Sequence, residues 1–275
     1  MSDENRWLDE ICQGVVRTGF RLKKRIFKAK SPFQTIEVVE TAGHGKLLII
    51  NGMTMASERD EFVCHEMLAH IPLFLHPRPR RVLVIGGGDG GAVREVLRHK
   101  TVELCVLVEI DALVVETAKK HIPQTASALS NRRALVRVED GAKFVRETSE
   151  RFDVVIVDST KPFGPAFYKD VRRILTERGI VVSQAGSPFY DLGTIKNLTK
   201  ILKTVFPVSD AYTFTNLTYP GGLWAFAYAS KGVHPVRHFN SARVKSARMP
   251  LQWYNEEIHV GAFALPEFLR KAVGR

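Results

Sequence analysis

Four carboxylates recur at comparable places in the middle of the chain: Asp89, Glu109, Asp140 and Asp158. Each stands at or just after the end of an apolar run, as in "RRVLVIGGGD" and "FDVVIVD". Randomly scattered surface acids would not fall into that register on a chain with a formal net charge of +11. Carboxylates at the ends of neighbouring strands are suited to binding a cation and to accepting a proton.

A glycine-rich turn, "GGGDGG", runs from Gly86 to Gly91 and leads straight into a helical segment. Glycine lets the backbone turn sharply and approach a ligand closely, and the helix N-terminus presents free N–H groups. Glu109 follows Asp89 by twenty residues and ends the next strand, where an acid typically binds a ribose hydroxyl pair. The turn, with Gly86 and Gly88, and Glu109 together predict a nucleoside site. Alternatively, Glu109 only caps the next helix.

Two further acids narrow the kind of nucleoside. Asp140, in "EDG" at the end of the third strand, can accept a hydrogen bond from an adenine amino group, although a plain helix N-cap is an alternative. Asp89, inside the glycine turn, would repel the pyrophosphate of a hydride-transfer cofactor, but it suits a nucleoside that carries a positive charge. Sulfonium nucleosides of the S-adenosyl class therefore fit this pattern best.

The elements that position these residues follow from the apolar pattern. Residues 1–60 hold strand-like pieces such as "FQTIEVVET" and "KLLIING", separated by "SP", "AGHG" and "NG", which indicates a small antiparallel β domain. From residue 61 to 275, a helical segment precedes Val/Ile/Leu-rich strands that alternate with helices. This predicts an α/β fold with a mostly parallel, Rossmann-like sheet covered by helices on both faces.

Composition excludes several classes of protein. At 45% hydrophobic and 25% charged residues, the 275-residue chain is typical of a soluble globular protein. No apolar run reaches the roughly eighteen residues of a membrane helix, and the polar start "MSDENRW" does not resemble a signal peptide. The three cysteines, Cys12, Cys64 and Cys105, are widely spaced and form no metal-like pair, which fits a reduced, cytoplasmic setting.

The positive charge is densest in "RLKKRIFKAK" at residues 21–30 and "RHFNSARVKSAR" at residues 237–248. Such runs can mark nucleic-acid binding. The first run, however, alternates basic with apolar residues as an exposed strand does, and no zinc-finger spacing or aromatic-glycine RNA-binding signature accompanies it. A nucleic-acid-binding methyltransferase is therefore a minority hypothesis, and it requires a contiguous basic face beside the mouth of the site.

Several motifs in combination resemble the polyamine aminopropyltransferases, the spermidine synthase family, over nearly the whole chain. They are "SPFQTIEVVET", "ERDEF", "HEMLAHIPL", "VLVIGGGDGGAVREVLRHKTVELCVLVEID", "VEDGAKFV", "FDVVIVDST", "RGIVVSQ", "TYPGGLWAFAYAS" and "YNEEIHVGAFALPEFL". The resemblance implies a small β domain on a methyltransferase-type Rossmann domain, a homodimer or homotetramer, and neither a metal nor a prosthetic group. It implies transfer of the aminopropyl group of decarboxylated S-adenosylmethionine to putrescine or a related amine acceptor, with release of methylthioadenosine.

The resemblance also implies roles on the donor side. Glu109 would bind the ribose, Asp140 the adenine, and Gln34 would reach the nucleoside from the N-terminal side. Asp89 and Asp158 would hold the aminopropyl ammonium, and Asp158 would also be the general base. An amine has an unperturbed pKa of about 10, so it arrives protonated at neutral pH and must lose a proton before it attacks the carbon next to sulfur.

On the acceptor side, several residues match the family pattern, and one residue in the "FVCHEM" segment departs from it. Gln184 and Tyr219 match residues that line the acceptor pocket, and His65 belongs to a motif that the family carries as "HEM" or "QEM". Before it, Cys64 stands where the family usually has a tyrosine that helps to orient the attacking nitrogen. Its loss removes a hydroxyl from the expected reaction centre.

Two further departures lie on the acceptor side. "INGMTMASERDE" has Asn51 and Met55 where the family has aspartate and glutamine, and "DSTKPFGPA" has Lys161 in place of a second acid. Lys161 can face solvent on a shortened loop, with acceptor contacts coming from elsewhere. If it points inward, it neutralises a carboxylate of an amino-acid acceptor or of intact S-adenosylmethionine, because a like charge disfavours a cationic amine.

Two other readings concern the activity itself. Relatives that became putrescine N-methyltransferases alter the aspartate of the glycine turn, whereas Asp89 is retained here. This argues for a donor chain that ends in an amine and against simple methyl transfer. A catalytically silent paralogue is the remaining alternative, which the surviving Asp158 and donor-side acids disfavour.

Overall fold

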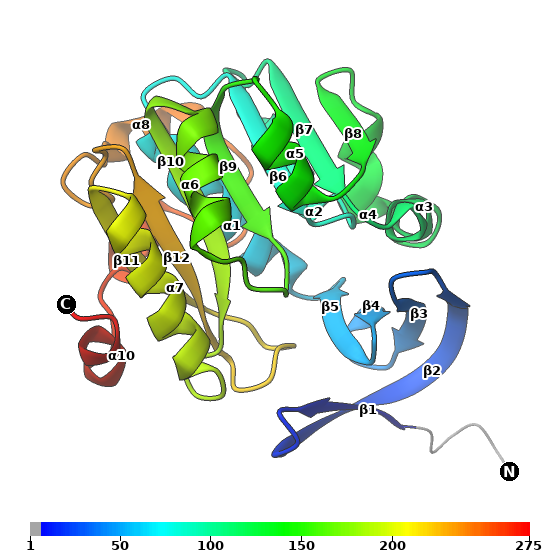
Figure 1. The fold of residues 1–275 in the computed structure, drawn as a ribbon. Coiled ribbons are helices and arrows are strands. Elements are labelled where there is room, and N and C mark those ends of the chain that lie inside the picture. Colours follow the sequence, from blue (N-terminus) through cyan, green and yellow to red (C-terminus); the bar gives the residue numbers. More distant parts are fainter. Residues whose placement is uncertain (1–6) are drawn as a thin grey trace, which may run out of the picture.

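A computed structural model describes residues 7–275, so residues 1–6 of the expected N-terminal domain lie outside the described residues. The chain begins with an antiparallel sheet whose strands pair in chain order (Figure 1). Its strands are β1 (Trp7–Cys12), β2 (Val16–Lys30), β3 (Thr35–Thr41), β4 (Gly45–Ile50) and β5 (Met53–Ser57). The predicted N-terminal antiparallel sheet is confirmed. The domain boundary expected between residues 60 and 61 falls in the turn that follows β5, and it stays a prediction.

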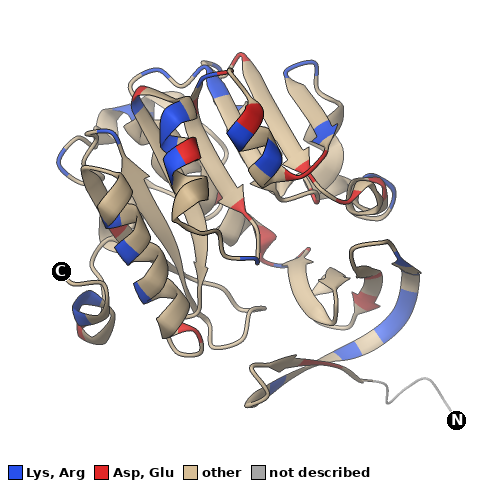
Figure 2. Cartoon of the chain, in the orientation of Figure 1, with Lys and Arg blue, Asp and Glu red and all other residues tan. Residues whose placement is uncertain are grey.

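The basic run at residues 21–30 forms the last two thirds of β2, along which Figure 2 shows Lys and Arg residues. Acids on β3 pair with part of this charge. Glu37 accepts from Arg25 at 2.6 Å and lies 3.1 Å from Lys28, and Glu40 lies 3.7 Å from Lys23. The run is therefore the exposed strand expected from its alternation, with part of its charge neutralised within the sheet.

The second sheet has seven strands in the order β11-β12-β10-β9-β6-β7-β8. The five strands from β10 to β8 run parallel, and β12 lies antiparallel between β10 and β11. The strands are β6 (Arg81–Gly86), β7 (Leu104–Glu109), β8 (Ala134–Val138), β9 (Phe152–Asp158), β10 (Leu175–Gly186), β11 (Val208–Thr215) and β12 (Leu223–Ser230).

Helices cover both faces of this sheet, as predicted. The helices are α1 (Glu61–Leu75), α2 (Gly91–Arg98), α3 (Ala112–His121), α4 (Pro123–Ala126), α5 (Gly141–Glu147), α6 (Pro165–Ile174), α7 (Leu192–Val205), α8 (Ser241–Ala247), α9 (Glu256–Ala262) and α10 (Glu267–Ala272), with a 3-10 turn, η2 (Ser127–Ser130). Side chains of β6 alternate between the faces: Val82 and Val84 pack in one core with α1 and α2, and Leu83 and Ile85 pack in the other with α5, α6 and α7.

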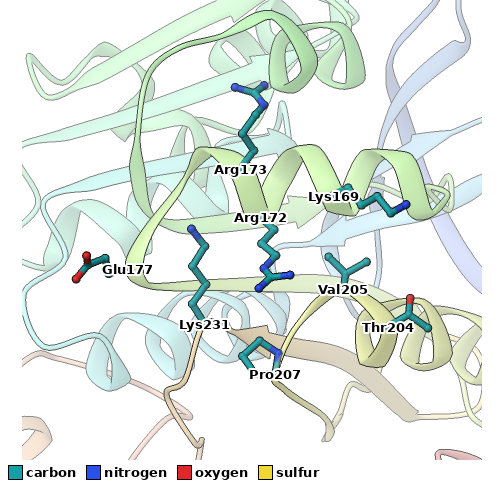
Figure 3. Close-up of a pocket in the computed structure, with 8 residues that line it drawn as sticks. All are labelled: Lys169, Arg172, Arg173, Glu177, Thr204, Val205, Pro207 and Lys231. Atoms are coloured by element: carbon teal, nitrogen blue, oxygen red, sulfur yellow. The ribbon is translucent and has the colours of Figure 1, made fainter.

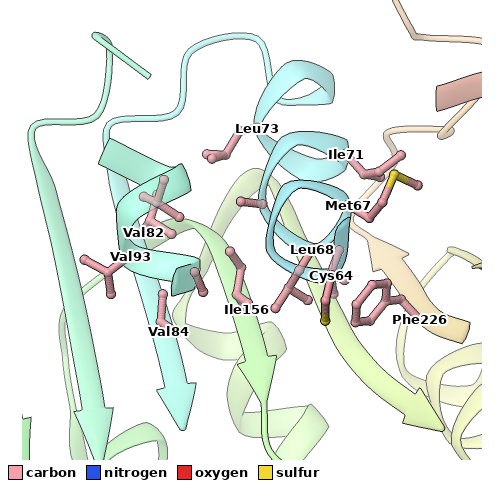
Figure 4. Packing of buried hydrophobic residues seen from close by; sticks show 14 of the residues in the cluster. Cys64, Met67, Leu68, Ile71, Leu73, Val82, Val84, Val93, Ile156 and Phe226 are labelled. Carbon is pink, nitrogen blue, oxygen red and sulfur yellow. The ribbon is translucent and has the colours of Figure 1, made fainter. Parts of the chain in front are cut away.

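Helix α1 is buried on nearly every side, which fixes the residues that it carries toward the site. Met67, Leu68 and Ile71 pack with β6, β9 and β12 (Figure 4), and burying each such side chain contributes about 1.5–3 kcal/mol. The carboxylate of Glu66 accepts hydrogen bonds from three consecutive backbone N–H groups at residues 252–254, at 2.8–2.9 Å. The C-terminal segment is thereby tied to this helix.

The strand order places the ends of the parallel strands on one edge of the sheet. β6 lies between β7 and β9, so the chain reverses its direction of progress across the sheet at β6. Gly86 is the register partner of Asp158, and Glu109 is the partner of Val138. Ligands of open α/β sheets bind in the crevice at such a switch point.

Candidate functional site

The glycine turn makes room for the acidic side chains around it. Gly87 has a φ of +68°, and a Cβ placed there would lie 2.5 Å from Asp158 Oδ2. A Cβ at Gly91, the first residue of α2, would lie only 2.2 Å from Nδ1 of the His65 ring. Only glycine therefore fits at these two positions, because a side chain would displace the groups of the site. Gly86, which begins the turn, also has a positive φ.

Glu109 is buried at the end of β7 and faces the turn. Its Oε2 accepts from the N–H of Gly88 at 3.2 Å, and its Oε1 accepts from the N–H of Asp111 at 3.0 Å. Burial raises the pKa of Glu109, and these backbone hydrogen bonds oppose the rise. The capping alternative is wrong for Glu109, because α3 is capped by Asp111, which accepts from the N–H of Leu113.

Gln34 reaches this end of the site from the N-terminal sheet. Its amide Nε2 donates to Asp111 Oδ2 at 2.9 Å, and the hydroxyl of Ser31 donates to the same oxygen at 2.6 Å. Sequence reasoning missed Asp111 and Ser31, although Asp111 is the last residue of the "EID" segment that drew attention to Glu109. These two hydrogen bonds tie the loop between β2 and β3 to the end of β7, which carries Glu109.

Asp140 lies at the start of α5, on the neighbouring strand end, and is exposed. Its Oδ1 accepts from the N–H of Lys143 at 2.8 Å, which is an N-cap. The capping interpretation of Asp140 is thus confirmed for one oxygen. Because the cap uses only Oδ1, the second oxygen can still accept a hydrogen bond from a ligand.

Asp89, Asp158 and His65 form a compact cluster. One carboxylate oxygen of each aspartate and one ring nitrogen of His65 all lie within 4.8 Å of one another. Asp89 Oδ1 accepts from the N–H of Gly91 at 2.9 Å, and Asp158 Oδ1 accepts from the amide of Gln184. Burial and the negative charge of Asp89 raise the pKa of Asp158 to about 6, against the opposing effects of His65 and Gln184.

His65 is buried with carboxylates on two sides. Its Nδ1 lies 2.5 Å from Glu61 Oε2, and its Nε2 lies 3.4 Å from Asp89 Oδ1. Burial lowers the pKa of His65, but Asp89, Glu61 and Asp158 outweigh it and raise that pKa to about 9. The ring is therefore an imidazolium at neutral pH, with both nitrogens protonated and no lone pair to offer a metal ion. The cluster is suited to an ammonium group; that no metal is needed stays a prediction.

Glu61 and Arg94 support His65, and sequence reasoning missed both. The guanidinium of Arg94 binds both oxygens of Glu61, at 2.7 and 2.9 Å, and its Nε lies 2.7 Å from Glu95. Burial would raise the pKa of Glu61, but His65 and Arg94 lower it to about 2. The signal was present in the sequence, because Glu61 and His65 have the i, i+4 spacing that places two side chains on one helix face.

The residues expected on the acceptor side come together from three parts of the chain. Cys64 on α1 is buried, and its thiol pKa is raised by burial and by the negative charge of Asp158. Tyr219, in the loop between β11 and β12, donates to the carbonyl of Met55 at 2.6 Å. Burial and the proximity of Cys64 raise the pKa of the Tyr219 hydroxyl. Cys64 and Tyr219 thus lie near enough to Asp158 for its charge to act on them, and Gln184 donates a hydrogen bond to it.

Comparison with known proteins decides the family. The model of the spermine/spermidine synthase domain matches residues 61–239, and that of the spermidine synthase tetramerisation domain matches residues 6–58. The chain belongs to the spermine/spermidine synthase family. The expected domain boundary lies between the two matched ranges.

Relatives of this family are similar over nearly the full chain. A polyamine aminopropyltransferase of Methanocaldococcus jannaschii is 44% identical, covering 97% of this chain and 94% of the relative. One from Thermotoga petrophila is 42% identical, covering 92% and 88%. A crystal structure of spermidine synthase with the transition-state analogue AdoDATO has a TM-score of 0.97 at 40% identity, covering 98% and 96%. The spermidine synthase of Thermotoga maritima has a TM-score of 0.95 at 40% identity, covering 98% and 94%.

Lys161 is the departure from the family pattern that the structure places most clearly. Its side chain is exposed on the loop after β9. Its backbone N–H donates to the hydroxyl of Ser159 at 3.2 Å. Among residues 7–275, its ammonium forms no hydrogen bond or ion pair with Asp158. The structure therefore favours the solvent-facing interpretation over an inward-pointing lysine.

Figure 3 shows a basic hollow whose lining includes none of the residues of the carboxylate cluster. Its lining includes Arg172 near the end of α6 and Lys231 just after β12. Because Ser230 is the register partner of Ile180, near the start of the parallel part of β10, the hollow lies at the amino ends of the parallel strands. The nucleic-acid hypothesis requires a basic face beside the site mouth, and this hollow lies at the opposite edge.

The length and hydropathy of the helices test whether any of them could span a membrane. Within residues 7–275, no helix combines the length and the apolar character required to cross a membrane.

Proposed function

We propose that this chain is a polyamine aminopropyltransferase. It transfers the aminopropyl group of decarboxylated S-adenosylmethionine to an amine acceptor such as putrescine and releases methylthioadenosine. The observation that carries the proposal is the Asp89–Asp158 pair at the strand ends, beside the buried carboxylate of Glu109. Two carboxylates that face each other across a glycine turn suit an alkyl ammonium, and an acid after the second strand suits a ribose.

The donor nucleoside extends from this pair toward the N-terminal sheet. Glu109 accepts hydrogen bonds from the ribose hydroxyls, and Asp140 uses the oxygen that does not cap α5 to accept from the adenine amino group. Gln34, held through Asp111, closes the nucleoside end from the other sheet. Gly86 and Gly88 let the backbone approach the donor.

The reaction is an in-line displacement. The carboxylate of Asp158 takes a proton from the acceptor ammonium, and the neutral nitrogen then attacks the methylene carbon attached to sulfur. A nitrogen–carbon bond forms as the carbon–sulfur bond breaks, and the electron pair of that bond goes to sulfur and neutralises the sulfonium. The product is a secondary ammonium, and the proton on Asp158 leaves to solvent. Positioning of the two reactants supplies much of the rate.

The environment of Asp158 supports its role as general base. A base works best when its pKa lies near the operating pH, and the pKa of Asp158 is raised to about 6 by burial and by Asp89. The amide of Gln184 holds one oxygen of Asp158 and leaves the other for the acceptor. Cys64 and Tyr219 form the adjoining wall of the acceptor pocket, and Lys161 stays in solvent.

We further propose that the protein works as a homodimer or homotetramer in the cytoplasm. The N-terminal residues match the spermidine synthase tetramerisation domain. Trp7, Ile11 and Val15, in the hairpin of β1 and β2, are 59%, 56% and 75% exposed, which is the kind of apolar surface that a second subunit covers. Light scattering coupled to size-exclusion chromatography measures the assembly. The cysteines Cys12, Cys64 and Cys105 are all free, as a reducing compartment requires.

A mass-spectrometric screen tests the function. Decarboxylated and intact S-adenosylmethionine are each offered against diamines, longer polyamines and amino acids, and the product mass is read. The proposal predicts that an aminopropyl group is added to a diamine and that methylthioadenosine appears in equal amount. Methyl or aminocarboxypropyl addition from intact S-adenosylmethionine would contradict it, as would the absence of any product.

A further inference from the structure

A chain of buried charges leads from α2 into the site. Arg94 on α2 binds both oxygens of Glu61 on α1, and Glu61 in turn binds Nδ1 of His65 one helical turn later. Glu61 is 7% and His65 3% exposed, so these contacts are formed out of water. Charge-assisted hydrogen bonds between ionised groups are the stronger ones, and a bidentate arginine adds a fixed geometry.

The His65 ring is held on three sides. Glu61 binds Nδ1, the backbone of Gly91 packs directly against the ring, and Nε2 faces Asp89. The ring therefore cannot turn away without losing the Glu61 contact or displacing the start of α2. Its second N–H stays directed at the carboxylate pair.

Charged and titratable groups face His65 from each neighbouring element. They are Glu61 from α1, Asp89 from the glycine turn and Asp158 from the end of β9, while Arg94 of α2 acts on it through Glu61. Glu61 is neutralised by Arg94. What remains at the mouth of the donor pocket is two carboxylates and one imidazolium, a formal net charge of −1.

We propose that His65, fixed by Glu61 and Arg94, is a positioning residue that serves as a permanent counter-cation of the Asp89–Asp158 pair, so that the site accepts one ammonium and not two. The proposal rests on the aminopropyltransferase function above and deepens it. The ammonium of the donor chain offsets this charge, and the sulfonium of the donor adds one positive charge nearby. A second ammonium, on the reactive nitrogen of the acceptor, would leave an excess positive charge in a poorly solvated site.

The consequence is that the site selects the neutral form of the reactive nitrogen of the acceptor. The reactive nitrogen of the acceptor must give up its proton in order to stay beside Asp158, and only the neutral nitrogen can form the new bond. His65 thus acts through the carboxylates and touches neither reacting atom. An uncharged residue at this position would let the acceptor bind as an unreactive ammonium.

The test uses the full-length protein with His65→Gln, which keeps a hydrogen-bonding side chain and removes the charge, and with Glu61→Gln, which weakens the hold on the ring. Arg98→Gln is the matched control, since Arg98 lies one turn beyond Arg94 and pairs with Glu95 at 2.8 Å, outside the Glu61–His65 pair. Rates are measured from pH 5 to 10 with saturating decarboxylated S-adenosylmethionine, and propylammonium is the competitive probe.

Three results are expected for His65→Gln. The acid limb of kcat moves up by about one pH unit, because Asp158 loses a cationic neighbour. The KM for the diamine falls while kcat falls by about tenfold or more, since the acceptor now binds protonated. Propylammonium inhibits about tenfold more strongly. Glu61→Gln shifts all three in the same direction, and Arg98→Gln leaves them within about twofold of the parent.

The proposal is overturned if His65→Gln is folded, as judged by circular dichroism, binds methylthioadenosine normally, and keeps the acid limb, the KM and the propylammonium inhibition of the parent. A variant that only loses stability and kcat, with an unmoved pH profile, also overturns it, because that is the signature of a structural role. A parent protein that forms no aminopropylated product in the mass-spectrometric screen contradicts the proposed function instead, so the two failures are distinguishable.

Discussion

Gly86 on β6 and Asp158 on β9 are direct partners in the parallel register, and this pairing brings the expected base against the glycine turn. The turn that starts at Gly86 carries Asp89, so the two carboxylates meet although they lie 69 positions apart in the sequence. The charge of Asp89 is one cause of the raised pKa of Asp158. The register of two neighbouring strands therefore contributes, beside burial, to the raised pKa of Asp158.

Asp158→Asn should lower kcat by about 10²–10⁴, because the amide cannot take the proton of the acceptor amine. Binding of methylthioadenosine, measured by calorimetry, should change little, since the nucleoside contacts lie at Glu109 and Asp140. Asp170→Asn, at a partly exposed position of α6, is a matched control for the charge change. An Asp158→Asn enzyme that turns over at the parent rate would remove the base assignment.

The rate itself should depend on pH through Asp158. Its pKa is raised to about 6, and the ionised form is the active one, so kcat should fall tenfold per unit below about pH 6 and level off above it. The measurement is product formation at saturating donor and acceptor. A profile that is flat from pH 5 to 8 would mean that another group accepts the proton.

His65 makes the stability of the fold pH-dependent. The pKa of His65 is about 9 in the folded protein, above its ordinary value near 6.5, so its stabilising contribution is complete below about pH 6.5 and is lost as the pH rises through about 9. The loss should reach at most about 3 kcal/mol, from 1.36 kcal/mol per pKa unit. Urea denaturation at pH 6.5 and 9.5 measures it. His65→Gln should lack this part of the pH dependence, and an equal loss in parent and variant would contradict the prediction.

Lys161→Asp should leave the rate with putrescine within about twofold of the parent, because the lysine side chain is exposed and the effect of a surface charge is screened. Steady-state kinetics in about 0.15 M salt, with Lys161→Ala as the neutral control, make the comparison. A large gain in activity for Lys161→Asp alone would show that the residue points into the acceptor pocket in solution.

Substitutions at Asp140 can separate its two roles, which are to cap α5 and to bind the donor. Asp140→Asn should keep the cap of α5, since asparagine caps helices as well as aspartate does, but it should weaken donor binding by about tenfold through loss of the acceptor charge. Asp140→Ala should lose donor affinity and also about 1 kcal/mol of stability. Calorimetry with methylthioadenosine and thermal unfolding are the two measurements. Unchanged donor affinity in Asp140→Asn would leave Asp140 as a cap alone.

The pattern of apolar residues was sufficient to predict much of the fold. Continuous Val/Ile/Leu runs such as "RVLVIG" and "FDVVIV" are buried on both faces only in a parallel sheet covered by helices, and that sheet is present. The parallel sheet also made it possible to predict that the glycine turn and the acids at the strand ends lie together, because parallel strands end on one edge. The first antiparallel sheet followed from its turn residues.

Local sequence patterns could not predict the contacts between segments that are distant in the chain. The Arg94–Glu61–His65 chain depends on how α1 and α2 pack against each other, and the bonds from Gln34 and Ser31 to Asp111 depend on how the two sheets meet. No periodicity carries that information, since it is set by side-chain packing across elements. The direction of Lys161 is likewise a property of a folded loop.

The sequence by itself determined the order of strands and helices, the glycine turn and the row of acids. Local propensity and apolar periodicity depend only on residues that are close together in the chain. Only the tertiary structure decided which of those acids share a pocket, that His65 carries a charge between them, and that Lys161 does not enter. The physical reason is that burial and electrostatic interactions act through space, where Asp89 and Asp158 are neighbours, and not along the chain, where they are far apart.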